Sequence, residues 1–158
     1  MTVQLVPLDL DVARAVLQGS PADALTALNL RCGRGWPHAD TADAMRPVVA
    51  QRDTVGSFLV VVADEVIGEC GWRGRPDGVG EVEIGYGLAP SARGRGHGTA
   101  AVRALMAWVE QQPEVRAVRA EVLQGNAPSR RLLERLGFQH APDATPPYVA
   151  YVREAPTN

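Results

Sequence analysis

The sequence predicts a mixed α/β sheet with flanking helices, and three observations support this fold class. Two β-branched-rich runs joined by a two-residue turn indicate an antiparallel hairpin. A later strand, a Gly-rich loop, an amphipathic helix and a further strand indicate a parallel crossover. The 158 residues are 46% hydrophobic and 22% charged, which is ordinary globular composition. We expect a single domain over residues 1–158, long enough to bury a core without disulfides.

The first half of the chain is expected to hold helices and the hairpin. The second helix takes Ser20 as its N-cap and Pro21 in its first turn. Asp64 and Glu65 join the two hairpin strands. In chain order the elements are a strand at 3–8, helices at 9–18, 20–30 and 41–51, and strands at 58–63 and 66–72.

The second half of the chain is expected to carry the crossover. The strand at 81–88 alternates, with Val82 and Ile84 on one face and Glu81 and Glu83 on the other. Gly85 and Gly87 continue the second face, where glycine often marks a bulge or the close approach of a ligand. The remaining elements are a helix at 98–111, a strand at 115–123, a helix capped by Asn126 and closed by Gly137, a late strand from Phe138, and a last strand at 148–154.

Composition excludes several function classes. All 16 basic residues are Arg, which excludes P-loop NTPases and Schiff-base enzymes because both need a Lys. The net charge of −2 argues against a broadly basic nucleic-acid binder. Cys32 and Cys70 match no zinc or redox spacing, so we expect no metal and reduced thiols. The N-terminus lacks a basic signal region and no apolar run is membrane-length, which predicts a cytoplasmic protein without membrane contact.

The charge distribution points to an anionic ligand. Residues 93–135 hold eight Arg and four Glu, whereas the rest of the chain holds eight Arg and fourteen acidic residues. Within the basic segment, Gly94, Gly96 and Gly98 alternate just before a helix, whose N-terminal N–H groups favour anions. Arg93 and Arg95 add mobile positive charge. The loop therefore predicts a phosphate or pyrophosphate site, with a flexible surface turn as the alternative.

A dinucleotide fold is the weaker alternative for this loop. Residues 96–101 fit the GxGxxA fingerprint formally. That fingerprint needs its glycines at the strand–helix turn itself, but five residues separate Leu88 from Gly94. An antiparallel hairpin also precedes the strand, which a dinucleotide-binding unit does not predict.

The chain resembles the GNAT superfamily of acyl-CoA N-acyltransferases over nearly its whole length. Residues 93–98, RGRGHG, fit the R/Q-x-x-G-x-G/A pyrophosphate loop of that family. A second motif follows, N-x-x-S from Asn126 to Ser129 and then Leu132, Leu133, Leu136, Gly137 and Phe138. This second motif is similar to the branch that acetylates the N-termini of ribosomal proteins.

The resemblance implies a central sheet splayed into a V between the strands at 81–88 and 115–123. The pantetheine arm of acetyl-CoA would lie in that slot, and the glycine loop would bind the pyrophosphate. Asn126 would reach the arm or cap its helix. The implied cofactor-binding residues are Leu88, Ala89, Arg93, Gly94, Arg95, Gly96, His97, Gly98, Thr99, Asn126 and Ser129.

The implied reaction is attack of an amine on the thioester of acetyl-CoA, without a metal. An amine that is mostly protonated at pH 7 needs a base, and Glu83 is the candidate, with an ordinary strand carboxylate as the alternative. Many family members carry a Tyr as the acid where this chain has Leu133, so Ser129 is the candidate partner of the leaving thiol. The acceptor is a protein N-terminus or a small-molecule amine, and the protein is a monomer or homodimer. A non-catalytic acyl-CoA sensor is the alternative.

Overall fold

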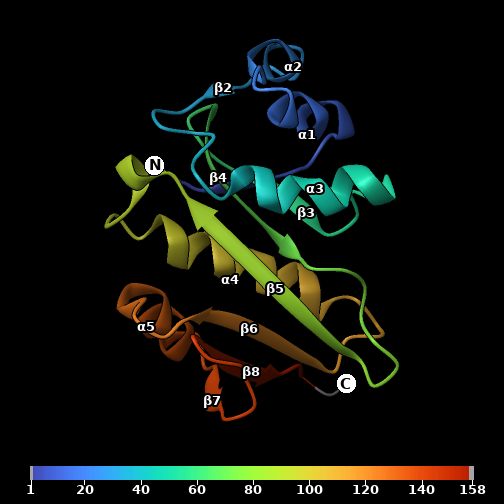
Figure 1. The fold of residues 1–158 in the computed structure, drawn as a ribbon, viewed down its shortest axis with the longest axis vertical. Coiled ribbons are helices and arrows are strands. Elements are labelled where there is room, and N and C mark those ends of the chain that lie inside the picture. Colours follow the sequence, from blue (N-terminus) through green and yellow to red (C-terminus); the bar gives the residue numbers. More distant parts are fainter. Residues whose placement is uncertain (1, 157–158) are drawn as a thin grey trace. The chain divides into compact units, whose positions relative to one another are not determined.

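The computed structural model describes residues 2–156 and divides the chain into two compact units. Unit 1 comprises Met1–Gly71 and Tyr86–Val102, and unit 2 comprises Trp72–Gly85 and Arg103–Asn158. Two elements run from one unit into the other, strand β5 (Glu81–Leu88) and helix α4 (His97–Glu110) (Figure 1). Within the described residues, no helix is both long and apolar enough to cross a membrane.

Unit 1 is built on the predicted hairpin. Strands β1 (Gln4–Pro7), β3 (Ser57–Val62) and β4 (Glu65–Trp72) pair antiparallel in that order, and β2 (Arg31–Cys32) pairs parallel with β4. The hairpin turn lies at Ala63 and Asp64 and not at Asp64 and Glu65 as predicted, because Ala63 and Asp64 take φ values of 49° and 65° and Glu65 already pairs with Val62. The helices of this unit are α1 (Leu10–Leu17), α2 (Ala22–Thr26) and α3 (Thr41–Gln51).

The helix expected at 20–30 is shorter than predicted. It begins at Ala22, so Pro21 and not Ser20 occupies the N-cap position. No side chain caps this helix N-terminus with a hydrogen bond. It ends because Asn29 takes a φ of 60° and the Leu30 N–H donates to the Leu25 carbonyl, the geometry of a Schellman C-cap. The chain can then enter β2, which the sequence pattern did not predict.

Unit 2 contains the parallel strand pairing that was predicted for the crossover. β5 pairs parallel with β6 (Ala117–Leu123), from Glu81 opposite Ala117 to Ile84 opposite Ala120. β6 pairs antiparallel with β8 (Tyr148–Glu154), which pairs antiparallel with β7 (Gln139–Ala141). These orange and red strands lie side by side in Figure 1, with helix α5 (Ala127–Arg135) beside them. The strand order β1-β3-β4-β5-β6-β8-β7 confirms the predicted mixed sheet.

The alternation predicted for β5 decides which of its side chains reach solvent. Val82 and Ile84 are buried, whereas Glu81 and Glu83 are half-buried. The buried core of unit 2 contains Ile84, Leu105, Val118, Leu133 and Tyr151. Glu83 therefore lies on the accessible face of a strand whose other face is fixed by packing.

Candidate active site

The glycine-rich segment forms an exposed loop between β5 and α4 in unit 1. A short 3₁₀ turn, Pro90–Ala92, follows β5, and Gly94 and Gly96 then adopt φ values of +77° and +80°. An added Cβ at either glycine would meet nothing within 4 Å, so glycine is needed here for backbone conformation and not for space. His97, Gly98 and Thr99 form the first turn of α4. A 14-residue helix thus begins at the end of this loop, where its N–H groups and dipole favour an anion.

Arg93 is less mobile than the sequence suggested. Its Nε and Nη2 atoms both donate to the Leu88 carbonyl, at 3.2 and 3.1 Å. The guanidinium therefore ties the loop to the end of β5. Arg93 and Arg95 are both exposed, but only Arg93 is bonded to the Leu88 carbonyl.

Leu88 and Ala89 differ in what they offer to a ligand. The Ala89 N–H donates to the Ile67 carbonyl at 2.8 Å, and Ala89 is buried. In an antiparallel ladder successive residues point their N–H and C=O groups to opposite edges, so those of Leu88 point away from β4. Leu88 is consequently the residue of this pair whose backbone N–H is not directed at β4.

The second motif forms the start of α5 in unit 2. The Asn126 side chain accepts a hydrogen bond from the Ser129 N–H at 3.3 Å, so Asn126 is the N-cap of this helix. Ser129 lies in the first turn and is half-buried. Leu133, at the position where the resemblance implies a Tyr, is fully buried in the core of unit 2. That position therefore supplies no hydroxyl for the leaving thiol.

The surroundings of Glu83 shift the pKa of its carboxyl group. Its side chain is about one-third exposed, and the Arg73 Nη1 atom lies 3.9 Å from its Oε1. No hydrogen bond to this carboxylate is present among residues 2–156. Burial raises the pKa of Glu83 and Glu121 raises it further, while Arg73 and Arg119 lower it. The net effect is a pKa above that of an ordinary carboxylate.

The spaces above Gly85 and Gly87 are filled by the chain's own side chains. An added Cβ at Gly85 would lie 2.5 Å from the Arg73 Nε atom. One at Gly87 would lie 2.8 Å from the Glu69 Oε2 atom and 2.9 Å from the His38 Cε1 atom. The close approach expected at these glycines is thus made by internal side chains.

Glu69 is a buried carboxylate that the sequence analysis missed. Its Oε1 accepts hydrogen bonds from the Trp36 Nε1 atom at 3.1 Å and the Thr41 hydroxyl at 2.8 Å. Its Oε2 lies 2.7 Å from the His38 Nε2 atom, and the Asp40 N–H donates to His38 Nδ1. This bonding places the imidazole proton on Nε2, so His38 also donates to Glu69. The available signal was a lone Glu inside the apolar strand predicted at 66–72.

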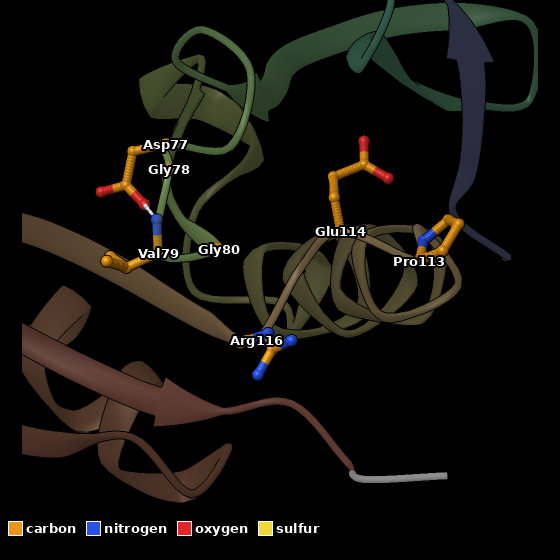
Figure 2. Close-up of a pocket in the computed structure, with 7 residues that line it drawn as sticks. All are labelled: Asp77, Gly78, Val79, Gly80, Pro113, Glu114 and Arg116. Carbon is orange, nitrogen blue, oxygen red and sulfur yellow. Dashed lines mark hydrogen bonds between the residues drawn. The ribbon is translucent and has the colours of Figure 1, made fainter.

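Two further features bear on ligand binding, the distribution of metal-ligating side chains and a hollow in unit 2. Within the described residues, no group of three metal-ligating side chains comes together. A hollow of about 490 Å³ in unit 2 is lined by the loop before β5 and the turn after α4 (Figure 2). Its charged side chains, Asp77, Glu114 and Arg116, point in different directions and do not converge on one point. None of the predicted site residues lines this hollow.

The comparisons with known proteins decide the family. The sequence profile of the acetyltransferase (GNAT) domain matches residues 3–139. An uncharacterized N-acetyltransferase, YjdG of Bacillus subtilis (strain 168), is 30% identical over 123 residues, 73% of each chain. The chain belongs to the GNAT acetyltransferase family. The matched segment runs from β1 to the start of β7 and so includes elements of both units.

Solved structures agree on the fold of this GNAT acetyltransferase. RimL, a ribosomal L7/L12 alpha-N-protein acetyltransferase in complex with coenzyme A, has a TM-score of 0.69 and 17% identity, covering 98% of this chain and 94% of its own. Mycobacterium smegmatis RimJ, in complex with CoA-disulfide, has a TM-score of 0.68 and 22% identity, covering 97% and 82%. At these identities the likeness concerns the fold.

Proposed function

We propose that this GNAT acetyltransferase transfers an acetyl group from acetyl-CoA to a primary amine. The observation that carries the proposal is the exposed loop from Arg93 to Gly98, in which two glycines with positive φ precede the N-terminus of α4. The backbone N–H groups of this loop would bind the pyrophosphate, and Arg95 would add charge. The coenzyme A in the RimL and RimJ structures supports this choice of donor.

Glu83 is the proposed base. The amine nitrogen attacks the thioester carbonyl carbon, a C–N bond forms, and the amine proton passes to Glu83 directly or through one water. The tetrahedral intermediate then collapses, the C–S bond breaks and the thiolate leaves. A base with a raised pKa drives this proton transfer better than an ordinary carboxylate does.

Ser129 is the proposed partner of the leaving thiolate, because its hydroxyl can donate a hydrogen bond to sulfur. Leu133 cannot serve as an acid, since it has no polar atom and is buried. A thiolate is a sufficiently stable anion to leave with hydrogen-bond support alone. Asn126 shapes this site through its cap of α5.

The acceptor is proposed to be a protein N-terminus or a small-molecule amine. The likeness to RimL, named as an alpha-N-protein acetyltransferase, supports the first class. The second candidate function is a sensor that binds acyl-CoA without turnover, and the buried Leu133 at the acid position favours it.

Two measurements test the proposal. Acetyl-CoA at about 100 times its dissociation constant should stabilise the fold by about 2.7 kcal/mol in a melting experiment, with NAD and ATP as controls that leave the melting temperature unchanged. Thiol release from acetyl-CoA is then followed with a panel of N-terminal peptides, polyamines, aminoglycosides and amino acids. Stabilisation without thiol release on any amine supports the sensor, and a shift with NAD alone contradicts both candidates.

The loop glycines give a matched test of pyrophosphate binding. In Gly96→Val, a β-branched side chain must adopt a left-handed backbone conformation, which changes the direction of the loop N–H groups. We expect loss of CoA binding in a folded protein. Gly74→Val is the control, because Gly74 has a similar φ of +79° and equally open surroundings but lies in the loop after β4. Equal CoA affinity in both variants would exclude the loop as the pyrophosphate site.

A further inference from the structure

Arg119 lies opposite Glu83 in the parallel pairing of β5 and β6. Side chains of paired residues project from the same face of a sheet, so this guanidinium is positioned to form an ion pair with Glu83. The structure shows a different arrangement. The Arg119 Nε atom donates to Glu121 at 3.2 Å, and its Nη1 atom donates to Asp143 at 2.9 Å.

The three side chains of this network differ in their exposure to solvent. The Arg119 side chain is 14% exposed, that of Glu121 is 30% exposed and that of Asp143 is 67% exposed. Glu121 lies on β6 beside Arg119, and Asp143 lies in the loop between β7 and β8. Two carboxylates from separate elements thus bind opposite ends of one largely buried guanidinium.

We propose that Glu121 and Asp143 are positioning residues that hold the Arg119 guanidinium away from Glu83, so that Glu83 stays available to accept the proton of the acceptor amine. The inference rests on the proposed function, because it takes Glu83 as the base. A carboxylate bound to a guanidinium by hydrogen bonds is a weaker base. The network prevents that pairing at the one position where β6 places a cation opposite Glu83.

The charged groups around Glu83 determine the direction in which each substitution should shift its pKa. Beyond burial, the groups that act on the Glu83 carboxylate are Arg73 after β4, Glu81 on its own strand, and Arg119 and Glu121 on β6. Removing the Glu121 charge takes away a group that raises the Glu83 pKa, and it also releases Arg119 toward Glu83. Both effects lower the pKa. Removing the Arg119 charge acts in the opposite direction and raises it.

The test compares Glu121→Gln, Asp143→Asn and Arg119→Gln with Glu81→Gln, a matched loss of one carboxylate on the same strand as Glu83. Titration of the Glu83 side-chain carboxyl carbon is followed by ¹³C NMR in the protein alone. The pH profile of kcat/KM is measured with one acceptor amine throughout, so that titration of the amine contributes equally to every profile.

We expect the NMR titration and the acidic limb of kcat/KM to move to lower pH in Glu121→Gln and Asp143→Asn, and to higher pH in Arg119→Gln. Glu81→Gln should give the smallest shift, because Glu81 has the weakest of these effects. A Glu83 titration that does not move, or moves in the same direction in Glu121→Gln and Arg119→Gln, overturns the inference. Opposite NMR shifts with an unmoved kcat/KM profile support the network and show that Glu83 is not the base.

Discussion

The two carboxylates Glu69 and Glu83 lie beside different glycines of β5 and have opposite environments. Glu69, in unit 1 next to Gly87, is buried and accepts hydrogen bonds from Trp36, Thr41 and His38. Glu83, in unit 2 on the strand of Gly85, is partly exposed, and its one ion pair among residues 2–156 is the 3.9 Å contact with Arg73. Glu69 is therefore held in place by hydrogen bonds, while Glu83 is partly buried without them and has a raised pKa.

The difference shows why burial alone does not identify a catalytic acid or base. Both ring nitrogens of His38 are bonded, Nε2 to Glu69 and Nδ1 to the Asp40 N–H. These hydrogen bonds of Glu69 join the segment from Trp36 to Thr41 to β4. Glu83 lacks those donors, and desolvation raises its pKa by more than the charges of Arg73 and Arg119 lower it.

The largest expected effect comes from Glu83→Gln. This change keeps size and hydrogen-bonding capacity but removes the proton acceptor, so kcat/KM at neutral pH should fall by roughly 10²–10⁴-fold. CoA affinity should stay nearly constant. The deficit should shrink as pH rises, because more of the amine is then already neutral.

Glu81→Gln is the control for that change, since Glu81 is on the same face of β5 and should cost little activity. Because the pKa of Glu83 is raised, wild-type activity should be lost with falling pH above the usual carboxylate range. Equal losses in the two variants, or a Glu83→Gln deficit that is flat with pH, would make Glu83 a structural residue.

Glu69→Ala should reduce stability instead of chemistry. It leaves three buried donors without an acceptor, and each costs about 1–3 kcal/mol. We expect the free energy of unfolding, measured with urea, to fall by about 3 kcal/mol or more. Glu69→Gln keeps an acceptor for part of the network and should lose less. A Glu69→Ala protein with unchanged unfolding free energy would show that the network is not structural.

Gly87→Ala should have an intermediate effect. The new Cβ would meet the buried Glu69 and His38 side chains, which are fixed by their hydrogen bonds and cannot withdraw without breaking them. Overpacking of this kind costs about 1–3 kcal/mol, and thermal unfolding should show it.

Gly85→Ala is the matched change and should have the smallest effect on stability. Its Cβ would meet the Arg73 guanidinium, the far end of an exposed and flexible side chain that can move aside. We expect a loss within about 0.5 kcal/mol. Because Arg73 lowers the pKa of Glu83, its displacement should also move the acidic limb of kcat/KM to higher pH. A Gly85→Ala protein as unstable as Gly87→Ala would contradict the comparison of the two glycines.

Local sequence patterns predicted the elements with strong periodicity or strong caps. The bounds of β5, α3 and β8 agree with prediction because alternation and flanking turn residues act over a few neighbours. The Asn126 cap followed from the same local logic. The pattern failed at β2 because two residues carry no period, and at α2 because a left-handed Asn29 ended the helix.

By itself the sequence determined the family, through two motifs whose glycines and cap residues act within their own loops. Only the tertiary structure decided what surrounds each carboxylate. The partners of Glu69 come from positions up to 33 residues away, and Arg119 joins Glu121 to Asp143, 24 residues from Arg119 in sequence. Hydrogen bonding and desolvation depend on such distant neighbours, so the protonation behaviour of a side chain is a property of the fold.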